Sequence, residues 1–201
     1  FRTRRASDGT FTYYGIGHVW RTMRTNLTGN FQTGNAALAL AACEQLLRQD
    51  QAMTEACIRK GLANTVWPGR LEVIQENPLV IFDGAHNLIA ARNLARYLAR
   101  HIKGQKITLV TGILDDKPYA AMLKSLLPLC ARVVLTQPAI NRALPPETLQ
   151  KVAQNYTENI EIIPDVGTAV RHAIDTTDPR DAVCVAGSLY LVGDAKKSLA
   201  R

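Results

Sequence analysis

Short apolar runs alternate with helical patterns through the chain after about residue 70. Strands are expected near 71–75, 79–82, 107–111, 132–136, 160–163 and 182–186, and helices over 87–101, 116–127, 146–155, 166–176 and 188–199. The 87–101 pattern is the clearest, because apolar residues mark one helical face and arginines the other. Short apolar strands that alternate with helices are typical of buried parallel sheets. The pattern therefore predicts an α/β fold with a mainly parallel sheet and helices on both faces.

The pattern is different in the first third of the chain. Residues 1–30 are rich in Thr, Tyr, Gly and Arg, and only Thr10–Tyr14 indicates a short strand before a turn. Residues 35–48 are dense in strong helix formers and predict a buried helix. A second helix is expected over 54–62, with Thr54 as its cap, before Trp67-Pro68-Gly69 interrupts regular structure. That interruption indicates a domain boundary.

Composition and charge narrow the class of protein. With 201 residues and 47% hydrophobic content the chain can fill a core, so a disordered protein is excluded. The 24 Lys and Arg against 17 Asp and Glu give a net charge of +7, which suits an anionic partner. The basic residues are spread along the chain and aromatics make up only 6%, which argues against nucleic acid. A non-catalytic module that binds anions or nucleic acid remains the alternative.

The cysteines and the apolar runs of the sequence indicate in which cellular compartment the protein is expected. Cys43, Cys57, Cys130 and Cys184 match neither a zinc motif nor a dense disulfide framework, so reduced, mostly buried thiols are expected. No apolar run approaches membrane-spanning length, and no secretory signal pattern follows the first residues. We expect a cytoplasmic protein with no membrane partner.

The loop between residues 82 and 88 carries the most distinctive chemistry. It places Asp83, a flexible glycine, His86 and Asn87 between a strand and a helix, and ligands of open parallel sheets bind beyond the carboxyl ends of strands. Asp83 could accept hydrogen bonds from ribose hydroxyls, and His86 could contact a phosphate or a reacting carboxylate and change protonation near neutral pH. The structural alternative is a helix cap at Asn87, a tight turn at Gly84 and loop amides bound by Asp83.

Two further positions could bind anions. Arg70 follows Pro68-Gly69, a hinge that could swing its guanidinium towards phosphate oxygens, although an ordinary surface ion pair is the alternative. Ser188 follows the last expected strand, where a hydroxyl and backbone amides meet a helix start, and its alternative is simple helix capping. The sequence has no phosphate-loop, dinucleotide-binding, zinc-protease or nucleophile-elbow motif. ATP chemistry would need parts that this chain does not supply.

Four motifs together carry a family resemblance. They are LTGNFQTGNAA from Leu27, WPGRLE from Trp67, DGAHN from Asp83 and GSLYLVG from Gly187. In order and spacing they resemble the folylpolyglutamate synthase family, including its bifunctional dihydrofolate synthase members, which belongs with the Mur ligases. A small departure is Leu88, where proline often follows DGAHN.

The resemblance implies a domain organisation. Residues 1–64 would be the tail of an incomplete, Mur-ligase-type central ATPase domain, and residues 65–201 would form the C-terminal Rossmann-like domain. In full length the protein is expected to be a monomer that binds no nucleic acid.

The resemblance also implies roles for single residues. Asn35 matches the family's asparagine at the adenine side, Arg70 the arginine that reaches the ATP phosphates, and Asp83 the aspartate that engages ATP from the other domain. His86 matches a histidine near the reacting centre, and Ser188 lies where this domain faces the incoming glutamate.

The chemistry implied by the resemblance is amide ligation with ATP and Mg²⁺. ATP phosphorylates a carboxylate of a folate or dihydropteroate, the amino group of L-glutamate attacks the acyl phosphate, and ADP and phosphate leave. The magnesium ligands, the phosphate-loop lysine and most of the folate pocket would lie upstream, so this chain alone is expected to be inactive and to hold no metal. Another Mur-type ligase with a different carboxylate acceptor is a further alternative.

Overall fold

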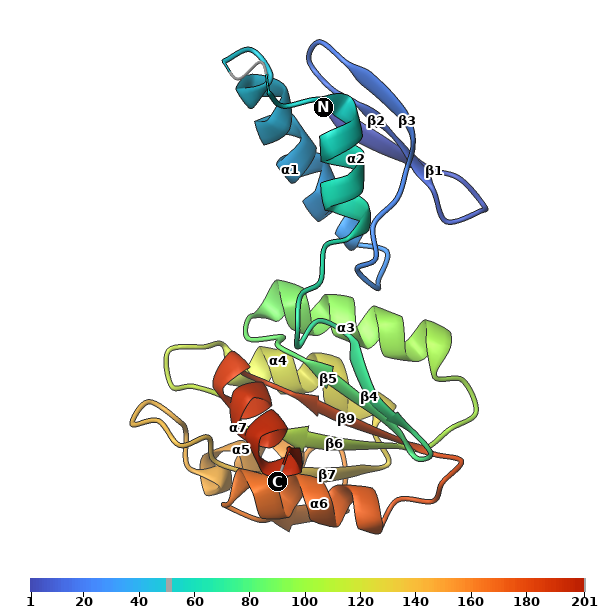
Figure 1. Cartoon of the computed structure of the whole chain (residues 1–201). Helices are drawn as coiled ribbons and strands as arrows, with labels where there is room; N and C mark the ends of the chain where they lie inside the picture. Colours follow the sequence, from blue (N-terminus) through green and yellow to red (C-terminus); the bar gives the residue numbers. More distant parts are fainter. Residues whose placement is uncertain (50–51, 201) are drawn as a thin grey trace. The chain divides into compact units, whose positions relative to one another are not determined.

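The chain divides into two compact units, Phe1–Pro68 and Gly69–Arg201, in the computed structural model (Figure 1). The structure describes residues 1–49 and 52–200. The division falls at the Trp67-Pro68-Gly69 interruption, a few residues after the expected limit at residue 64. Each unit has its own sheet and its own helices.

An antiparallel sheet and two helices form the first unit. The strands β1 (Arg2–Arg5), β2 (Phe11–Tyr14) and β3 (Val19–Met23) lie in that order, and the helices are α1 (Gln32–Leu46) and α2 (Glu55–Ala63). Side chains of β2, β3, α1 and α2 share one apolar core, which contains Phe11, Tyr13, Trp20, Met23, Ala36, Ala37, Leu40 and Ile58. Thr54 caps α2 as predicted, since its side chain accepts a hydrogen bond from the Cys57 amide at 3.2 Å.

Three expectations for this unit need correction. Strands β1 and β3 were not predicted from the sequence. Helix α1 is present, but it is not buried all round, because Leu38 and Leu46 on its outer side are 62% and 47% exposed. The cysteines are free as expected, but the expectation that they are mostly buried is wrong, because Cys57 is exposed, Cys43 and Cys130 are half-buried, and only Cys184 is buried.

A buried carboxylate fixes the β2–β3 turn. Glu44 of α1 is 2% exposed and accepts hydrogen bonds from the Tyr13 hydroxyl (2.8 Å) and from the amides of Ile16 (2.9 Å), Gly17 (3.2 Å) and His18 (2.8 Å). Burial alone would raise the pKa of Glu44, but these hydrogen bonds outweigh it and lower the pKa to about 2. The carboxylate therefore stays ionised and ties the helix to the turn.

A six-stranded sheet organises the second unit. Its order is β4-β5-β9-β6-β7-β8, where β4 is Glu72–Glu76, β5 Leu79–Asp83, β6 Ile107–Thr111, β7 Arg132–Leu135, β8 Ile160–Ile162 and β9 Ala182–Ala186. Strand β4 pairs antiparallel with β5, and the other pairs are parallel. This confirms the prediction of a mainly parallel sheet.

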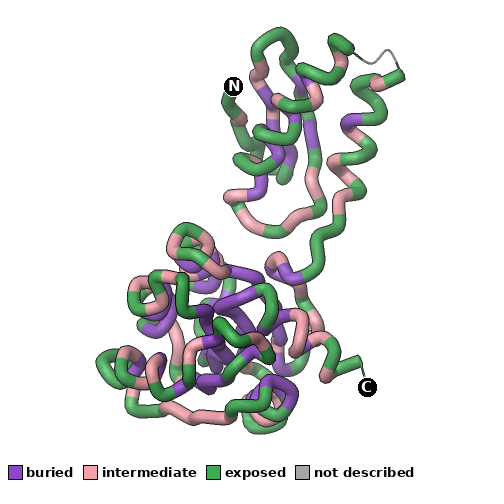
Figure 2. Tube along the Cα trace, turned by 90° about the vertical axis from the view of Figure 1, so that its left-hand side faces the viewer, coloured by how far each residue is buried: buried purple, intermediate pink, exposed green. Residues whose placement is uncertain are grey.

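Helices cover both faces of this sheet (Figure 1). Helices α6 (Val166–Asp175) and α7 (Leu189–Leu199) pack on one face against Val80, Phe82 and Val110 among others. Helices α3 (Leu88–His101), α4 (Tyr119–Leu126) and α5 (Pro146–Ala153) follow β5, β6 and β7, and α4 packs against both of its neighbours; a short 3-10 helix, Leu127–Leu129, follows α4. The strands inside are almost entirely buried (Figure 2).

The strand order determines where a site can form. Strand β9 comes last in the chain but lies between β5 and β6, so the carboxyl ends of these three strands are neighbours. Such a reversal of strand order is the usual ligand-binding position in open α/β sheets. Within residues 1–49 and 52–200, no helix is both long and apolar enough to cross a bilayer.

Candidate functional site

The loop after β5 lies at this reversal and is closed by a helix cap. Asn87 is the N-cap of α3, and its Oδ1 accepts a hydrogen bond from the Ala90 amide at 2.9 Å. Gly84 lies under the start of α7, because a Cβ atom on it would come 2.3 Å from the Leu189 side chain. The cap at Asn87 is therefore confirmed, whereas Gly84 is required by this close approach, and Asp83 and His86 are left as the chemical groups of the loop.

Asp83 is a buried carboxylate at the end of β5. Its side chain is 4% exposed, and Oδ2 accepts a hydrogen bond from the Leu71 amide at 3.0 Å. Burial raises the pKa of Asp83 above its usual value, and the Leu71 amide and the positive charges of Arg70 and His86 oppose this only in part. The carboxylate thus lies within the electrostatic reach of both basic residues.

Arg70 is the cation that this site leaves available. Its residue is half-buried, and in the part of the chain that the structure describes its guanidinium has no hydrogen-bond or ion-pair partner. Its neighbours Gly69 and Leu71 both have left-handed backbone angles, with φ of 72° and 48°. A half-buried guanidinium without a partner is suited to an anionic ligand.

His86 presents one free ring nitrogen. Its Nδ1 lies 2.8 Å from the Gly84 carbonyl oxygen. Because a carbonyl oxygen can only accept, Nδ1 carries the proton of this bond. In the neutral imidazole Nε2 is then an acceptor, which could receive a hydrogen bond or a proton.

Ser188 is the N-cap of α7. It is 1% exposed, and its Oγ accepts a hydrogen bond from the Leu191 amide at 3.0 Å. The capping interpretation is confirmed, and the hydroxyl keeps its proton and one lone pair for any other contact.

The sequence analysis missed Thr111. Asp83 pairs with Ala186, and Val110 pairs with Val185, so Thr111 lies beside Ala186 in the same row of the sheet. Thr111 is fully buried, and its Oγ1 has no hydrogen-bond partner within residues 1–49 and 52–200. No sequence signal could have found it, because the missing partner depends on neighbours far apart in the chain.

The structure therefore brings together four of the five predicted site residues. Arg70, Asp83, His86 and Ser188 all lie at the carboxyl ends of β5 and β9 in the second unit. Asn35 belongs to the first unit, where it is exposed on the first turn of α1 and donates to Gln32 Oε1 at 2.8 Å.

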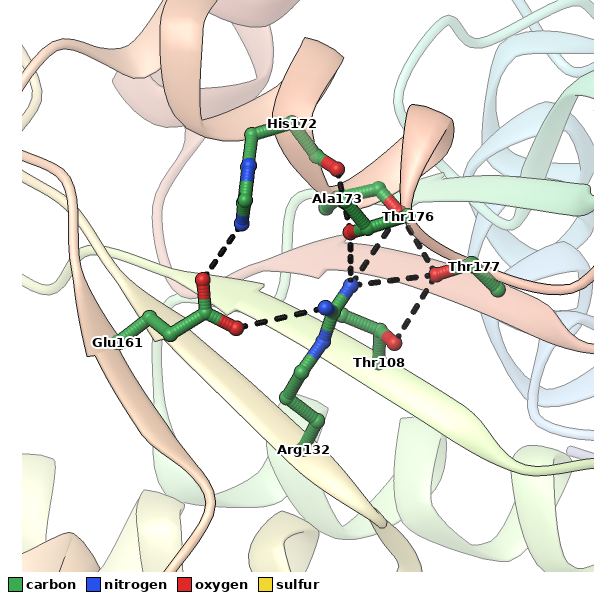
Figure 3. Close-up of polar contacts among 7 residues, drawn as sticks. All are labelled: Thr108, Arg132, Glu161, His172, Ala173, Thr176 and Thr177. Atoms are coloured by element: carbon green, nitrogen blue, oxygen red, sulfur yellow. Dashed lines mark hydrogen bonds and ion pairs between the residues drawn. The ribbon is translucent and has the colours of Figure 1, made fainter.

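Other polar groups of the second unit serve the fold. Glu161 accepts from Arg132 at 3.3 Å and lies 2.5 Å from His172 Nε2, which joins β7 and β8 to the end of α6 (Figure 3). Arg132 also donates to Thr176 Oγ1 at 2.7 Å. Arg132 is the first residue of β7, so this cluster lies near the amino ends of the strands, whereas the candidate site lies at their carboxyl ends.

A pocket of about 380 Å³ between the start of α6 and the second half of α7 is also separate from the site. Most of its charged lining already makes contacts within the protein, since Asp165 caps α6, Asp194 accepts from the Ala139 amide, and Arg171 donates to the Ser198 carbonyl. Within the described ranges, no group of three His, Cys, Asp or Glu side chains could hold a metal ion.

Comparisons with known proteins identify the family of this chain. The family model for the Mur ligase glutamate ligase domain matches residues 69–189. The chain belongs to the Mur ligase family. A Bacillus subtilis protein named dihydrofolate synthase/folylpolyglutamate synthase is 32% identical over 178 residues, which are 88% of this chain and 41% of that protein.

Three solved structures share the fold of this Mur ligase chain. A Mycobacterium tuberculosis folylpolyglutamate synthase complexed with ADP matches with a TM-score of 0.86, 28% identity and coverage of 100% of this chain and 47% of that one. An E. coli FolC in complex with DHPP and ADP has a TM-score of 0.84, 26% identity and coverage of 98% and 45%. A Yersinia pestis bifunctional synthase complexed with AMPPNP and Mn has a TM-score of 0.78, 28% identity and coverage of 95% and 44%. The resemblance is confirmed, and the chain spans less than half the length of these relatives.

Proposed function

We propose that this chain is the C-terminal part of an ATP-dependent folylpolyglutamate synthase, with or without dihydrofolate synthase activity. The longer enzyme would ligate L-glutamate to a folate or dihydropteroate carboxylate through an acyl phosphate. Residues 1–64 would be the tail of its ATPase domain, and residues 65–201 its C-terminal domain. The names and bound nucleotides of the relatives support this proposal.

One structural observation, the unpaired guanidinium of Arg70 among the described residues, supports the proposal. The guanidinium of Arg70 has no partner among the described residues, although it lies beside the buried Asp83 at the ligand-binding edge of the sheet. A phosphoryl group in transfer spreads negative charge over its oxygens, and a positioned arginine stabilises that charge. Arg70 would supply this stabilisation.

The other site residues would bind and orient the reactants. His86 Nε2 is free to accept a hydrogen bond or a proton near the reacting carboxylate. The hydroxyl proton of Ser188 and the amino end of α7 would favour a carboxylate of glutamate. Asn35 would lie at the adenine side of ATP.

We propose that the magnesium ion of this reaction binds to the upstream part of the longer enzyme, as the resemblance implies. Within residues 1–49 and 52–200 no group of three His, Cys, Asp or Glu side chains could hold a metal ion.

The variant Arg70→Ala tests the proposal in the longer enzyme. We expect ATP-dependent incorporation of labelled glutamate into a folate or dihydropteroate to fall by about 100-fold or more, as when one positioned charge-stabilising group is lost. Arg180→Ala is the matched control, because Arg180 is exposed and pairs only locally with Asp178. Turnover of Arg70→Ala within a few-fold of wild type contradicts the role of Arg70. Activity with neither acceptor would favour a different Mur-type ligase.

A further inference from the structure

Arg70 is held between two residues in the left-handed region of backbone space. Gly69 adopts this conformation easily, but Leu71 does not, because its Cβ crowds the backbone there. Leu71 is also buried, at 3% exposure. A strained, buried leucine persists only when its surroundings impose the conformation, and such residues cluster at functional sites.

Hydrogen bonds from the loop after β5 hold Leu71 in this left-handed conformation. Asp83 Oδ2 accepts from the Leu71 amide at 3.0 Å, and the Gly84 amide donates to the Gly69 carbonyl at 2.7 Å. On the other side Glu72 accepts from the Gly69 amide at 2.6 Å and from Lys196 Nζ at 2.7 Å. The backbone on both sides of Arg70 is therefore fixed, whereas the guanidinium itself is left free.

We propose that Asp83 is a positioning residue, whose carboxylate holds the Leu71 amide and so fixes the direction in which Arg70 leaves the backbone. This inference rests on the proposed function, because it takes Arg70 as the group that meets the phosphates. It assigns Asp83 an action through Arg70, in place of a direct contact with ATP. The 4% exposure of Asp83 and the use of Oδ2 by the protein itself agree with that action.

The neutral variant Asp83→Asn separates the two roles. An asparagine oxygen can still accept from the Leu71 amide, but the negative charge is gone. Asp83→Ala removes both. A positioning role therefore predicts that asparagine rescues what alanine loses, whereas a role that needs the charge predicts that both variants fail.

Amide hydrogen exchange of Leu71 in this chain tests the contact without any assay of activity. We expect exchange to be about tenfold or more faster in Asp83→Ala and within about threefold of wild type in Asp83→Asn, because exchange reports local opening. Asp165→Ala is the matched control, since Asp165 also accepts from a backbone amide, that of Thr168, at the same sheet edge. It should leave Leu71 exchange unchanged. Unchanged exchange in Asp83→Ala, or fast exchange in Asp83→Asn, overturns the proposal.

A double-mutant cycle in the longer enzyme tests the consequence. If Asp83 acts through Arg70, the pair Asp83→Ala with Arg70→Ala should be no slower than Arg70→Ala alone, and Asp83→Asn should retain more turnover than Asp83→Ala. Effects that multiply, or an inactive Asp83→Asn, refute the action through Arg70. If Arg70→Ala is itself fully active, the proposed role of Arg70 fails, and the exchange data alone decide whether Asp83 holds the segment.

Discussion

The substitution Glu44→Gln should weaken the first unit. The carboxylate receives hydrogen bonds on both oxygens, from the Tyr13 hydroxyl and the Ile16 amide on Oε2 and from the Gly17 and His18 amides on Oε1. A glutamine side chain offers one acceptor oxygen and one NH₂ donor. The Tyr13 hydroxyl can turn and accept from the new NH₂ group, so at least one amide donor loses its acceptor and faces another donor, and the other amides lose the negative charge of their acceptor.

The magnitude follows from two arguments. One buried amide left without an acceptor costs roughly 1 to 3 kcal/mol of unfolding free energy. The lowering of the Glu44 pKa from 4.5 to about 2 corresponds to an upper value of roughly 3 kcal/mol, since one unit is worth about 1.4 kcal/mol. The turn is partly exposed, so solvent screening reduces that value. We expect a loss of about 2 kcal/mol.

Fluorescence of Trp20 reports the unit selectively. Trp20 is buried in its core, and Trp67→Phe removes the only other tryptophan of the chain. For a unit of this size about 2 kcal/mol lowers the melting temperature by roughly 10 °C. Glu55→Gln is the control, because Glu55 forms an exposed pair with Arg59 and should shift it little.

The pH dependence of the stability difference between wild type and Glu44→Gln tests the role of the Glu44 charge. The folded pKa of Glu44 is below its unfolded value, so its stabilisation is complete above about pH 4.5 and is lost as the pH falls towards 2. The gap between wild type and Glu44→Gln should therefore be smaller at pH 3 than at pH 7. An equal difference in stability at both pH values, or a melting temperature lowered by less than about 2 °C at pH 7, would contradict the role given to the Glu44 carboxylate.

Three further substitutions test the carboxyl ends of the strands. Thr111→Val should raise stability by about 1 kcal/mol in chemical unfolding, because it removes a buried hydroxyl without a partner in the described chain. Thr136→Val should lower it by about 1 kcal/mol, since Thr136 donates to the Pro164 carbonyl at 2.9 Å, and equal signs for the two would contradict the argument. Gly187→Ala should cost about 2 kcal/mol or more, because φ is 137° and the new Cβ would lie 2.7 Å from Thr111 Oγ1. A melting temperature equal to that of wild type would count against this geometry.

The sequence predicts the second unit well because its strands carry their own signal. Runs such as residues 79–82 are apolar throughout, as is typical of strands buried on both faces. The first unit is harder to predict from the sequence, because β1 has the sequence Arg-Thr-Arg-Arg and lies at the edge of its sheet with little buried surface. Nothing in that run shows an alternation of apolar and polar residues.

The same reasoning applies to the site. The residues of the Asp83–Asn87 loop and Arg70 could be identified as candidates from the sequence, because an expected strand end and an expected helix start mark this loop. Their mutual arrangement could not, because it depends on the left-handed backbone of Leu71, which leucine disfavours. The hydrogen bond from Leu71 to Asp83 exists only after β4 has paired with β5.

The place of β9 in the sheet has a consequence for biosynthesis. A nascent polypeptide that has emerged only as far as residue 181 carries β5 and β6 without the strand that separates them. Each then presents a hydrophobic edge with free amides and carbonyls, which is a template for aggregation. A premature stop codon between residues 112 and 181 should thus yield inclusion bodies or rapid proteolysis, and not a shortened soluble product.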